Sequence, residues 1–65
     1  MVKQQFNDIA QLDLQGNKIA EISTGLIRCL PNLSSLDLCN NVVQQISVEI
    51  DRWKDTLVNL RLGNN

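Results

Sequence analysis

Two aspartates occupy the same place in two copies of a short pattern. Asp13 lies in "QLDLQ" and Asp37 lies in "SLDLC", and a shift of 24 along the sequence superimposes one on the other. If these stretches are neighbouring parallel strands, the two carboxylates lie within about 5 Å of each other. Carboxylates at that distance can share a proton or bind a cation such as Ca²⁺. The alternative is a solvated column in which Arg61 partly offsets Asp37; it is favoured because like charges on paired strands cost at most about 1 kcal/mol.

Other side chains that support catalysis or metal binding are missing or isolated. The chain has no histidine, which excludes Ser-His and Cys-His nucleophile pairs and the zinc sites that use imidazole. Cys29 and Cys39 do not form a C-x-x-C pair, and we expect both to be free thiols. The glycines stand singly, so the sequence contains no glycine-rich phosphate loop. The sequence therefore predicts no enzyme activity, no cofactor and no metal site.

Composition argues against several classes of partner. The 65 residues carry a net charge of -1, and their six basic residues are scattered, which gives no positive patch for nucleic acid or an anionic membrane. Phe6 and Trp53 are the only aromatic residues, too few to stack bases. The apolar runs are too short to cross a bilayer. Residues 1–6 lack a signal-peptide core, which together with free thiols slightly favours an intracellular location if Met1 is the natural start.

The chain repeats with a fixed period. A shift of 24 aligns "IAQLDLQGNKIAEI" (9–22) with "LSSLDLCNNVVQQI" (33–46), and a second shift of the same size aligns both with the shorter "LVNLRLGNN" (57–65). Leucine or asparagine recurs at three aligned positions: Leu12, Leu36 and Leu60; Leu14, Leu38 and Leu62; Asn17, Asn41 and Asn65. Three copies in register rarely arise by chance. We therefore expect one array, with a lead-in at 1–8, repeat 1 at 9–32, repeat 2 at 33–56 and the start of repeat 3 at 57–65.

Each repeat combines a strand pattern with a returning segment. Apolar and polar residues alternate in "QLDLQ", "SLDLC" and "NLRLG", which predicts short strands with one buried face. Strands this short are unstable alone, so one strand from each coil should stack into a parallel ladder. Between the strands, apolar residues follow helical spacing at Ile22, Leu26, Leu30 and Leu33, and at Ile46, Ile50, Trp53 and Leu57.

Capping residues flank these two returning segments. Ser23 or Thr24 can cap the first helical turn, and Pro31 ends it because the residue before proline disfavours helix. Ser47 is placed to cap the second turn. Trp53 stands at helical spacing, so we expect it to pack in the core rather than to bind a ligand. The sequence thus predicts a strand on one side of each coil and a short helical turn on the other.

The asparagine within each apolar pattern is expected to be structural. A side-chain amide has two donor hydrogens and an acceptor oxygen, so it can bond turn backbone on its own coil and on the next, where no water reaches. This predicts a structural asparagine ladder made of Asn17, Asn41 and Asn65.

The three copies resemble the leucine-rich repeat, whose signature is L-x-x-L-x-L-x-x-N-x-L. The matching residues are Ile9, Leu12, Leu14, Asn17 and Ile19; Leu33, Leu36, Leu38, Asn41 and Val43; and Leu57, Leu60, Leu62 and Asn65. The resemblance implies an α/β fold, the leucine-rich-repeat solenoid. In such a solenoid a curved right-handed coil carries short parallel strands on its concave face and short helical or 3₁₀ turns on its convex face.

What the resemblance implies for function is recognition of a protein partner by the concave strand face. The expected contacts are the outward residues of the strands: Gln11, Asp13, Gln15, Ser35, Asp37, Cys39, Asn59, Arg61 and Gly63. Asp13 and Asp37 would be acidic anchors and Arg61 the basic one. An extended, shallow surface of this kind suits a protein or peptide better than a small metabolite.

Three roles stay open for such a segment. The first is a scaffold or regulatory part of a longer protein. The second is part of a cell-surface adhesion or receptor ectodomain, since "DTLVNLRLGNN" is similar to repeats of chaoptin-type adhesion proteins and Asn32-Leu33-Ser34 is a glycosylation sequon. The third is the recognition region of a multidomain enzyme such as a kinase or GTPase. Neither end shows a polar capping unit, so we expect a fragment of a longer array or a chain that associates through its open ends.

Overall fold

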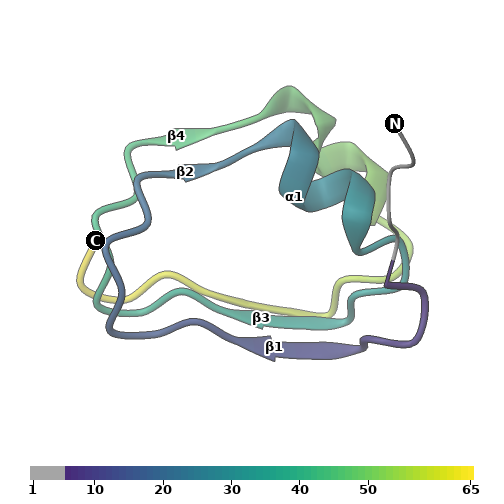
Figure 1. The fold of residues 1–65 in the computed structure, drawn as a ribbon, viewed down its shortest axis with the longest axis horizontal. Coiled ribbons are helices and arrows are strands. Elements are labelled where there is room, and N and C mark those ends of the chain that lie inside the picture. Colours follow the sequence, from purple (N-terminus) through teal and green to yellow (C-terminus); the bar gives the residue numbers. More distant parts are fainter. Residues whose placement is uncertain (1–5) are drawn as a thin grey trace.

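A computed structural model describes residues 6–65, and the chain follows a path that repeats from one coil to the next (Figure 1). Within these residues a parallel sheet has the strand order β1-β3-β5, with bounds β1 (Gln11–Asp13), β3 (Ser35–Asp37) and β5 (Asn59–Arg61). The register pairs Leu12 with Leu36 and Leu36 with Leu60. The stacking step predicted from the sequence is confirmed. Residues 1–5 of the predicted lead-in lie outside the described residues.

The returning segments lie opposite this sheet (Figure 1). They contain β2 (Glu21–Ile22) and helix α1 (Thr24–Cys29), then β4 (Gln45–Ile46) and the 3₁₀ helix η1 (Val48–Trp53). The pairing of β2 with β4 in a second parallel sheet was not predicted. The predicted helical stripes include Ile22 and Ile46, and this assignment is wrong because the helices begin only after the serines that follow them. Among residues 6–65, no helix has the length and apolarity that a membrane crossing requires.

Serine side chains start both helices. The hydroxyl of Ser23 accepts a hydrogen bond from the backbone N–H of Leu26 at 3.2 Å, and that of Ser47 accepts one from Glu49 at 3.1 Å. Each bond satisfies an N–H that has no partner inside the helix. Helix α1 ends at Cys29, and its C-cap is the residue before Pro31. Of the two predicted caps for this helix, Ser23 is confirmed, and Thr24 is instead its first residue.

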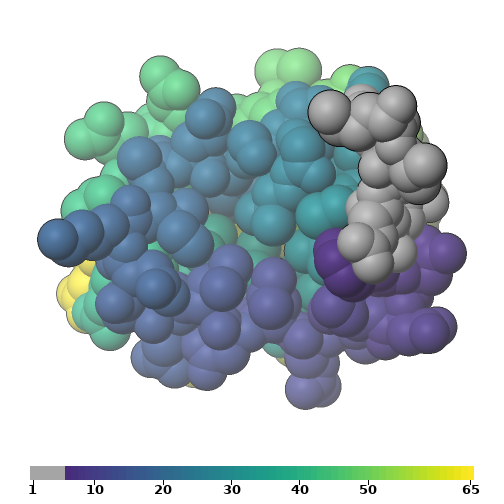
Figure 2. Space-filling view, in the orientation of Figure 1, coloured from purple at the N-terminus to yellow at the C-terminus, as the bar shows by residue number. Residues whose placement is uncertain are grey.

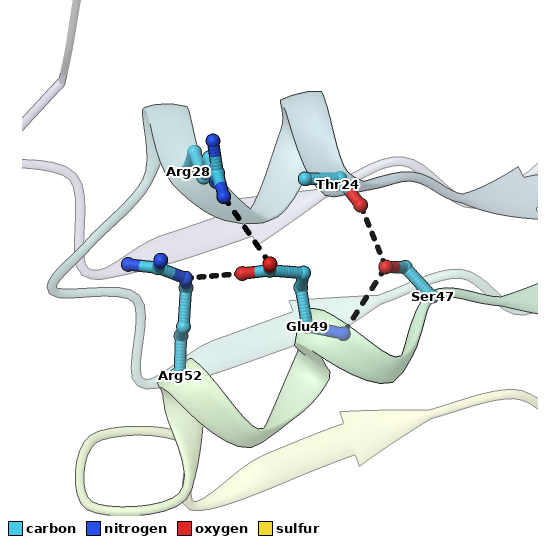
Figure 3. Close-up of polar contacts among 5 residues, drawn as sticks. All are labelled: Thr24, Arg28, Ser47, Glu49 and Arg52. Atoms are coloured by element: carbon cyan, nitrogen blue, oxygen red, sulfur yellow. Dashed lines mark hydrogen bonds and ion pairs between the residues drawn. The ribbon is translucent and has the colours of Figure 1, made fainter.

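Polar side chains join the two helices to each other (Figure 3). The hydroxyl oxygens of Thr24 and Ser47 lie 2.7 Å apart in a hydrogen bond. Arg28 Nη2 lies 3.2 Å from Glu49 Oε1, and Arg52 forms a second ion pair with the same carboxylate. The hydrogen bond from Arg52 lowers the pKa of Glu49, and Arg28 lowers it further. Glu49 is therefore held in its charged form, where it bridges neighbouring returns.

The apolar core lies between the sheet and the returns, and the middle coil buries its leucines most completely. Leu33, Leu36 and Leu38 are 0% exposed. The equivalent residues of the first and last coils are only partly buried: Ile9, Leu12, Leu14, Leu57, Leu60 and Leu62. This difference arises because the middle coil has a described coil on each side.

Trp53 fills the core at a place where the repeat departs from its pattern. The period aligns Lys54 with Leu30, and Lys54 is exposed. The neighbouring Trp53 is 1% exposed, and its indole N–H donates a hydrogen bond to the carbonyl oxygen of Leu30 at 2.9 Å. The predicted core position of Trp53 is confirmed, and its polar N–H has the partner that a buried indole requires.

A left-handed residue follows the strand in each of the described coils. The φ angles are +76° at Gly16, +59° at Asn40 and +61° at Asn64. Glycine has no Cβ to clash in this region, and asparagine tolerates it better than most residues. The next residue in each coil is the ladder asparagine. In each pair, Gly-Asn or Asn-Asn, the first residue therefore adopts the left-handed backbone conformation and the second supplies the side-chain amide.

Asn41 ties the first two coils together from a buried position. It is 5% exposed. Its Nδ2 donates to the carbonyl oxygens of Leu14 and Leu38, both at 3.0 Å, and its Oδ1 accepts from the backbone N–H of Ile19 at 3.0 Å. The bonds therefore reach the same coil and the preceding one. The side chain was expected to bond the following coil. This is wrong, because the amide of Asn41 lies over the end of the strand in the preceding coil.

The other two ladder asparagines differ in what surrounds them. Asn65 repeats the pattern of Asn41, with Nδ2 2.9 Å from the oxygen of Leu38 and Oδ1 2.9 Å from the N–H of Val43. Within the described residues, the side-chain bonds of Asn17 run to its own coil, at Leu14 O and Gln15 O. All three ladder asparagines were expected to be shielded from water. This expectation is confirmed for Asn41 and is wrong for Asn17 and Asn65, which are exposed.

Replacing Asn41 by alanine should lower the free energy of unfolding by about 1–3 kcal/mol, because the buried carbonyl of Leu38 and the part-buried N–H of Ile19 and carbonyl of Leu14 lose a hydrogen-bond partner. Asn17→Ala is the matched control, and its cost should be smaller because Asn17 is exposed and bonds its own coil. Urea denaturation followed by circular dichroism measures both values. Equal losses in the two variants would contradict the role of Asn41 in joining coils.

Candidate interaction surface

The residues predicted to contact a partner lie along one side of the β1-β3-β5 sheet. The register aligns Gln11, Ser35 and Asn59 in one row and Asp13, Asp37 and Arg61 in the next. A further residue of each coil follows shortly after the strand. We call this surface the strand face, and it comprises Gln11, Asp13, Gln15, Ser35, Asp37, Cys39, Asn59, Arg61 and Gly63.

Exposure varies across the strand face. The side chains of the first and third coils are exposed, whereas Ser35, Asp37 and Cys39 in the middle coil are half-buried. Neighbouring coils shade the middle strand on both sides, which accounts for the difference. A partner that spans all three strands would therefore reach the outer strands, at Asp13 and Arg61, most fully.

Each aspartate of the strand face is also bonded to its own chain. Asp13 Oδ1 accepts from the backbone N–H of Gln15 at 3.1 Å, and its Oδ2 accepts from the Gln15 side-chain amide at 3.2 Å. Asp37 Oδ1 accepts from the backbone N–H of Cys39 at 3.0 Å. These bonds orient both carboxylates. The sequence predicted that these aspartates would contact a partner and did not predict these local bonds. They could have been predicted from an aspartate placed before a turn, where its side chain commonly bonds the backbone N–H two residues later.

The electrostatic environment of Asp37 favours its ionised form. The backbone N–H of Cys39 lowers the pKa of Asp37 most, the Cys39 thiol and the charge of Arg61 lower it further, and burial acts in the opposite direction. This environment of Asp37 fits the solvated column with Arg61. Among residues 6–65, no three or more His, Cys, Asp or Glu side chains gather where a metal ion could be held.

A shallow depression lies on the strand face and opens to solvent. Its volume is about 340 Å³, and it is lined by Gln11, Leu12, Asp13, Ser35, Asp37 and Arg61. Two carboxylates and one guanidinium thus line the same concavity, beside a single leucine. Enclosed sites for small molecules are mostly apolar and bury most of their ligand. This open, charged depression suits the side chains of a protein partner better.

The two thiols are free and lie on different sides of the molecule. Cys29 ends helix α1, and its Sγ lies 3.2 Å from the oxygen of Leu26. Cys39 follows β3 on the strand face and stands next to Gly63, where a Cβ would lie 3.5 Å from Cys39 Sγ. A side-chain carbon at position 63 would therefore meet this thiol in ordinary van der Waals contact.

Comparison with known families bears on this architecture directly. A family model described as "Leucine Rich repeats (2 copies)" matches residues 10–52, which is more than half of the chain. The chain belongs to the leucine-rich repeat family. No curated protein and no solved structure matches it. Leucine-rich repeats are in general protein-interaction modules and are typically not enzymes, which agrees with a sheet surface that is open, polar and charged.

The stability of this leucine-rich repeat should fall in acid, in part through Asp37. A group whose pKa is lowered by folding contributes stability that is present above its unfolded pKa and is lost as the pH falls through its folded pKa. The loss should therefore begin below about pH 4. Asp37→Asn should flatten part of this decline when unfolding in urea is measured at several pH values. A variant with the full acid dependence of the original chain would show that folding leaves the pKa of Asp37 unchanged.

Proposed function

We propose that this chain binds a protein partner through the strand face and serves as a scaffold or regulatory part of a longer protein. The observation that carries the proposal is the row of Asp13, Asp37 and Arg61, which presents charges of both signs around an open depression. Opposite charges placed in fixed order favour one orientation of a partner and disfavour others. A complementary partner would present a basic group to the aspartates and an acidic group to Arg61.

Preorganisation of the row supports this proposal. The local bonds of Asp13 and Asp37 hold their carboxylates before any partner arrives, and the parallel ladder fixes the spacing between the strands that carry them. Side chains that are already ordered lose less conformational entropy on binding. Charged residues on a rigid sheet are thus better suited to specific recognition than the same residues on a loop.

The proposal also places the strand face on the inside of a bend. Each coil has a flat strand on one side and a wider helical turn on the other, an arrangement that curves repeat arrays towards their strands. Repeats at 9–32 and 33–56, with the start of a third at 57–65, would then form a segment of a curved right-handed solenoid whose concave side is the strand face.

A peptide-display library panned against the immobilised chain would provide ligands for a direct test. Selected peptides should bind at least about tenfold more weakly to Asp37→Lys, because the reversal places a positive charge where the partner presents one. Glu21→Lys is the matched control: Glu21 is an exposed acid on β2, outside the strand face, and its reversal should change the affinity less than about twofold. Fluorescence polarisation measures each dissociation constant.

A second variant separates binding from folding. Asp37→Lys also removes a bond to the backbone, whereas Arg61→Glu changes an exposed charge and should weaken the same peptides if they cross the whole row. Circular dichroism confirms that each variant is folded before affinity is compared. Equal losses from reversals at Asp37 and Glu21, or unchanged binding by both strand-face variants, would refute recognition through this surface.

A further inference from the structure

The strand face is open to solvent in the part of the chain that the structure describes. Among residues 6–65, no segment passes over the outside of the β1-β3-β5 sheet, which runs along the lower side of the coil in Figure 1. Figure 2 shows side chains of the first coil projecting from that side. Asp37 lies in the middle coil, with a described coil on each side, and is still only half-buried. Stacked coils on both sides therefore leave this surface accessible.

Two rows of side chains on this face differ in chemistry. One row is uncharged, with two amides and a hydroxyl that form no hydrogen bond within residues 6–65. It consists of Gln11, Ser35 and Asn59. The charged row beside it has two carboxylates followed by Arg61, whose guanidinium forms no ion pair in the described part of the chain. The uncharged row can hydrogen-bond a partner, and the charged row can orient it.

The spacing of the charged row matches the side chains of an α-helix. Neighbouring strands lie about 4.8 Å apart, so the three charged residues fall at about 0, 4.8 and 9.6 Å along the stack. An α-helix rises about 1.5 Å per residue, which places residues i, i+4 and i+7 of one face at about 0, 6.0 and 10.5 Å. In an extended peptide, side chains on one face recur about 6.6 Å apart, and the third lies at about 13 Å. The helix stays within about 1.2 Å of the row, whereas the extended peptide departs from it by about 3.6 Å.

We propose that the partner on the strand face is an α-helix of another protein, lying across the three strands with its axis along the stack of coils. This inference rests on the proposed function and adds the kind of partner to it. Residues i, i+4 and i+7 of that helix would face Arg61, Asp37 and Asp13 in turn. Charge complementarity then requires an acidic residue at the first of these positions and Lys or Arg at the other two.

The width of the strand face fits a single helix. Rows two residues apart on a strand are separated by about 6.6 Å, and a helix with its side chains is about 10–12 Å across. One helix can therefore cover the charged row and the uncharged row together. Residues of both rows line the depression of about 340 Å³, which would receive the basic side chain that meets Asp37.

The helix should run from the third coil towards the first. Within a helix, Glu placed four residues before Lys stabilises the helical state more than the reverse order does. The acidic residue that meets Arg61 therefore precedes the basic residues in the sequence of the partner. The expected pattern is Glu-x-x-x-Lys-x-x-Lys, with all three charged side chains on one face of the helix.

Three synthetic peptides test this proposal on the 65-residue chain. The first is an alanine-rich helix of about 18 residues that carries Glu, Lys and Lys at i, i+4 and i+7. The second has the same composition with its last Lys at i+9, on the opposite side of the helix. The third carries the same charges on alternate residues, with prolines that prevent helix formation. Fluorescence polarisation should show the first peptide binding at least about tenfold more tightly than either of the others.

A charge exchange tests which residues meet. Arg61→Glu should weaken binding of the first peptide by about tenfold, and replacing the Glu of that peptide by Lys should restore its affinity for the variant. A purely structural effect of Arg61→Glu would not be reversed by a change in the peptide. Glu21→Lys, on β2 and outside the strand face, should change the affinity of the first peptide less than about twofold.

The outcomes separate this inference from the proposed function. If the proline-containing peptide binds as tightly as the first and Asp37→Lys weakens both, the strand face binds a partner and the helix is wrong. Equal affinity for the first and second peptides would also overturn the helix. So would the absence of binding by all three up to about 1 mM, if peptides selected by display still lose affinity for Asp37→Lys. Binding that Asp37→Lys and Arg61→Glu both leave unchanged would refute the helix and the proposed function together.

Discussion

The architecture depends on satisfying backbone groups at the turn where each strand ends. Coils stack closely there, so N–H and carbonyl groups turn away from water without finding all their partners in the same coil. The amide of Asn41 supplies those partners across two coils at once. An unpaired buried group costs free energy comparable to a lost hydrogen bond. Every coil must therefore return its asparagine to the same place, which fixes the repeat length and hence the register of the sheet.

The sequence predicts well the features that recur in it. Strand positions, register and the serine caps follow from period and residue type, and the core position of Trp53 follows from its place in an apolar stripe. The β2–β4 pairing escaped prediction because strands of two residues show no alternation. The local bonds of Asp13 and Asp37 escaped because an outward position in a strand does not reveal how the following turn folds back onto the carboxylate. The direction of the asparagine bonds depends on how the turn folds over the preceding coil. The period of the sequence does not show whether a side chain bonds the preceding coil or the following one.

The row of charges on the strand face also has an order along the stack of coils. Viewed across the sheet, Asp13, Asp37 and Arg61 form a polar surface over an open depression. Viewed along the stack, the row begins with a negative residue and ends with a positive one. A leucine-rich repeat of this kind thus carries a direction in its surface charge as well as in its chain.

The bridge formed by Glu49 has a mechanical consequence. On the sheet side, backbone hydrogen bonds hold neighbouring coils at the distance between paired strands, about 4.8 Å. On the other side, the backbone pairing of β2 with β4 holds the returning segments. Helices α1 and η1 are joined by side chains: the carboxylate of Glu49 with Arg28 and Arg52, and the hydroxyl pair of Thr24 and Ser47. The contact between the two helices therefore depends on charged and hydroxyl side chains, whereas the contact between the strands depends on backbone hydrogen bonds. Dissolved salt, which screens exposed ion pairs and spares backbone hydrogen bonds, would therefore weaken the link between α1 and η1 while leaving the paired strands in place.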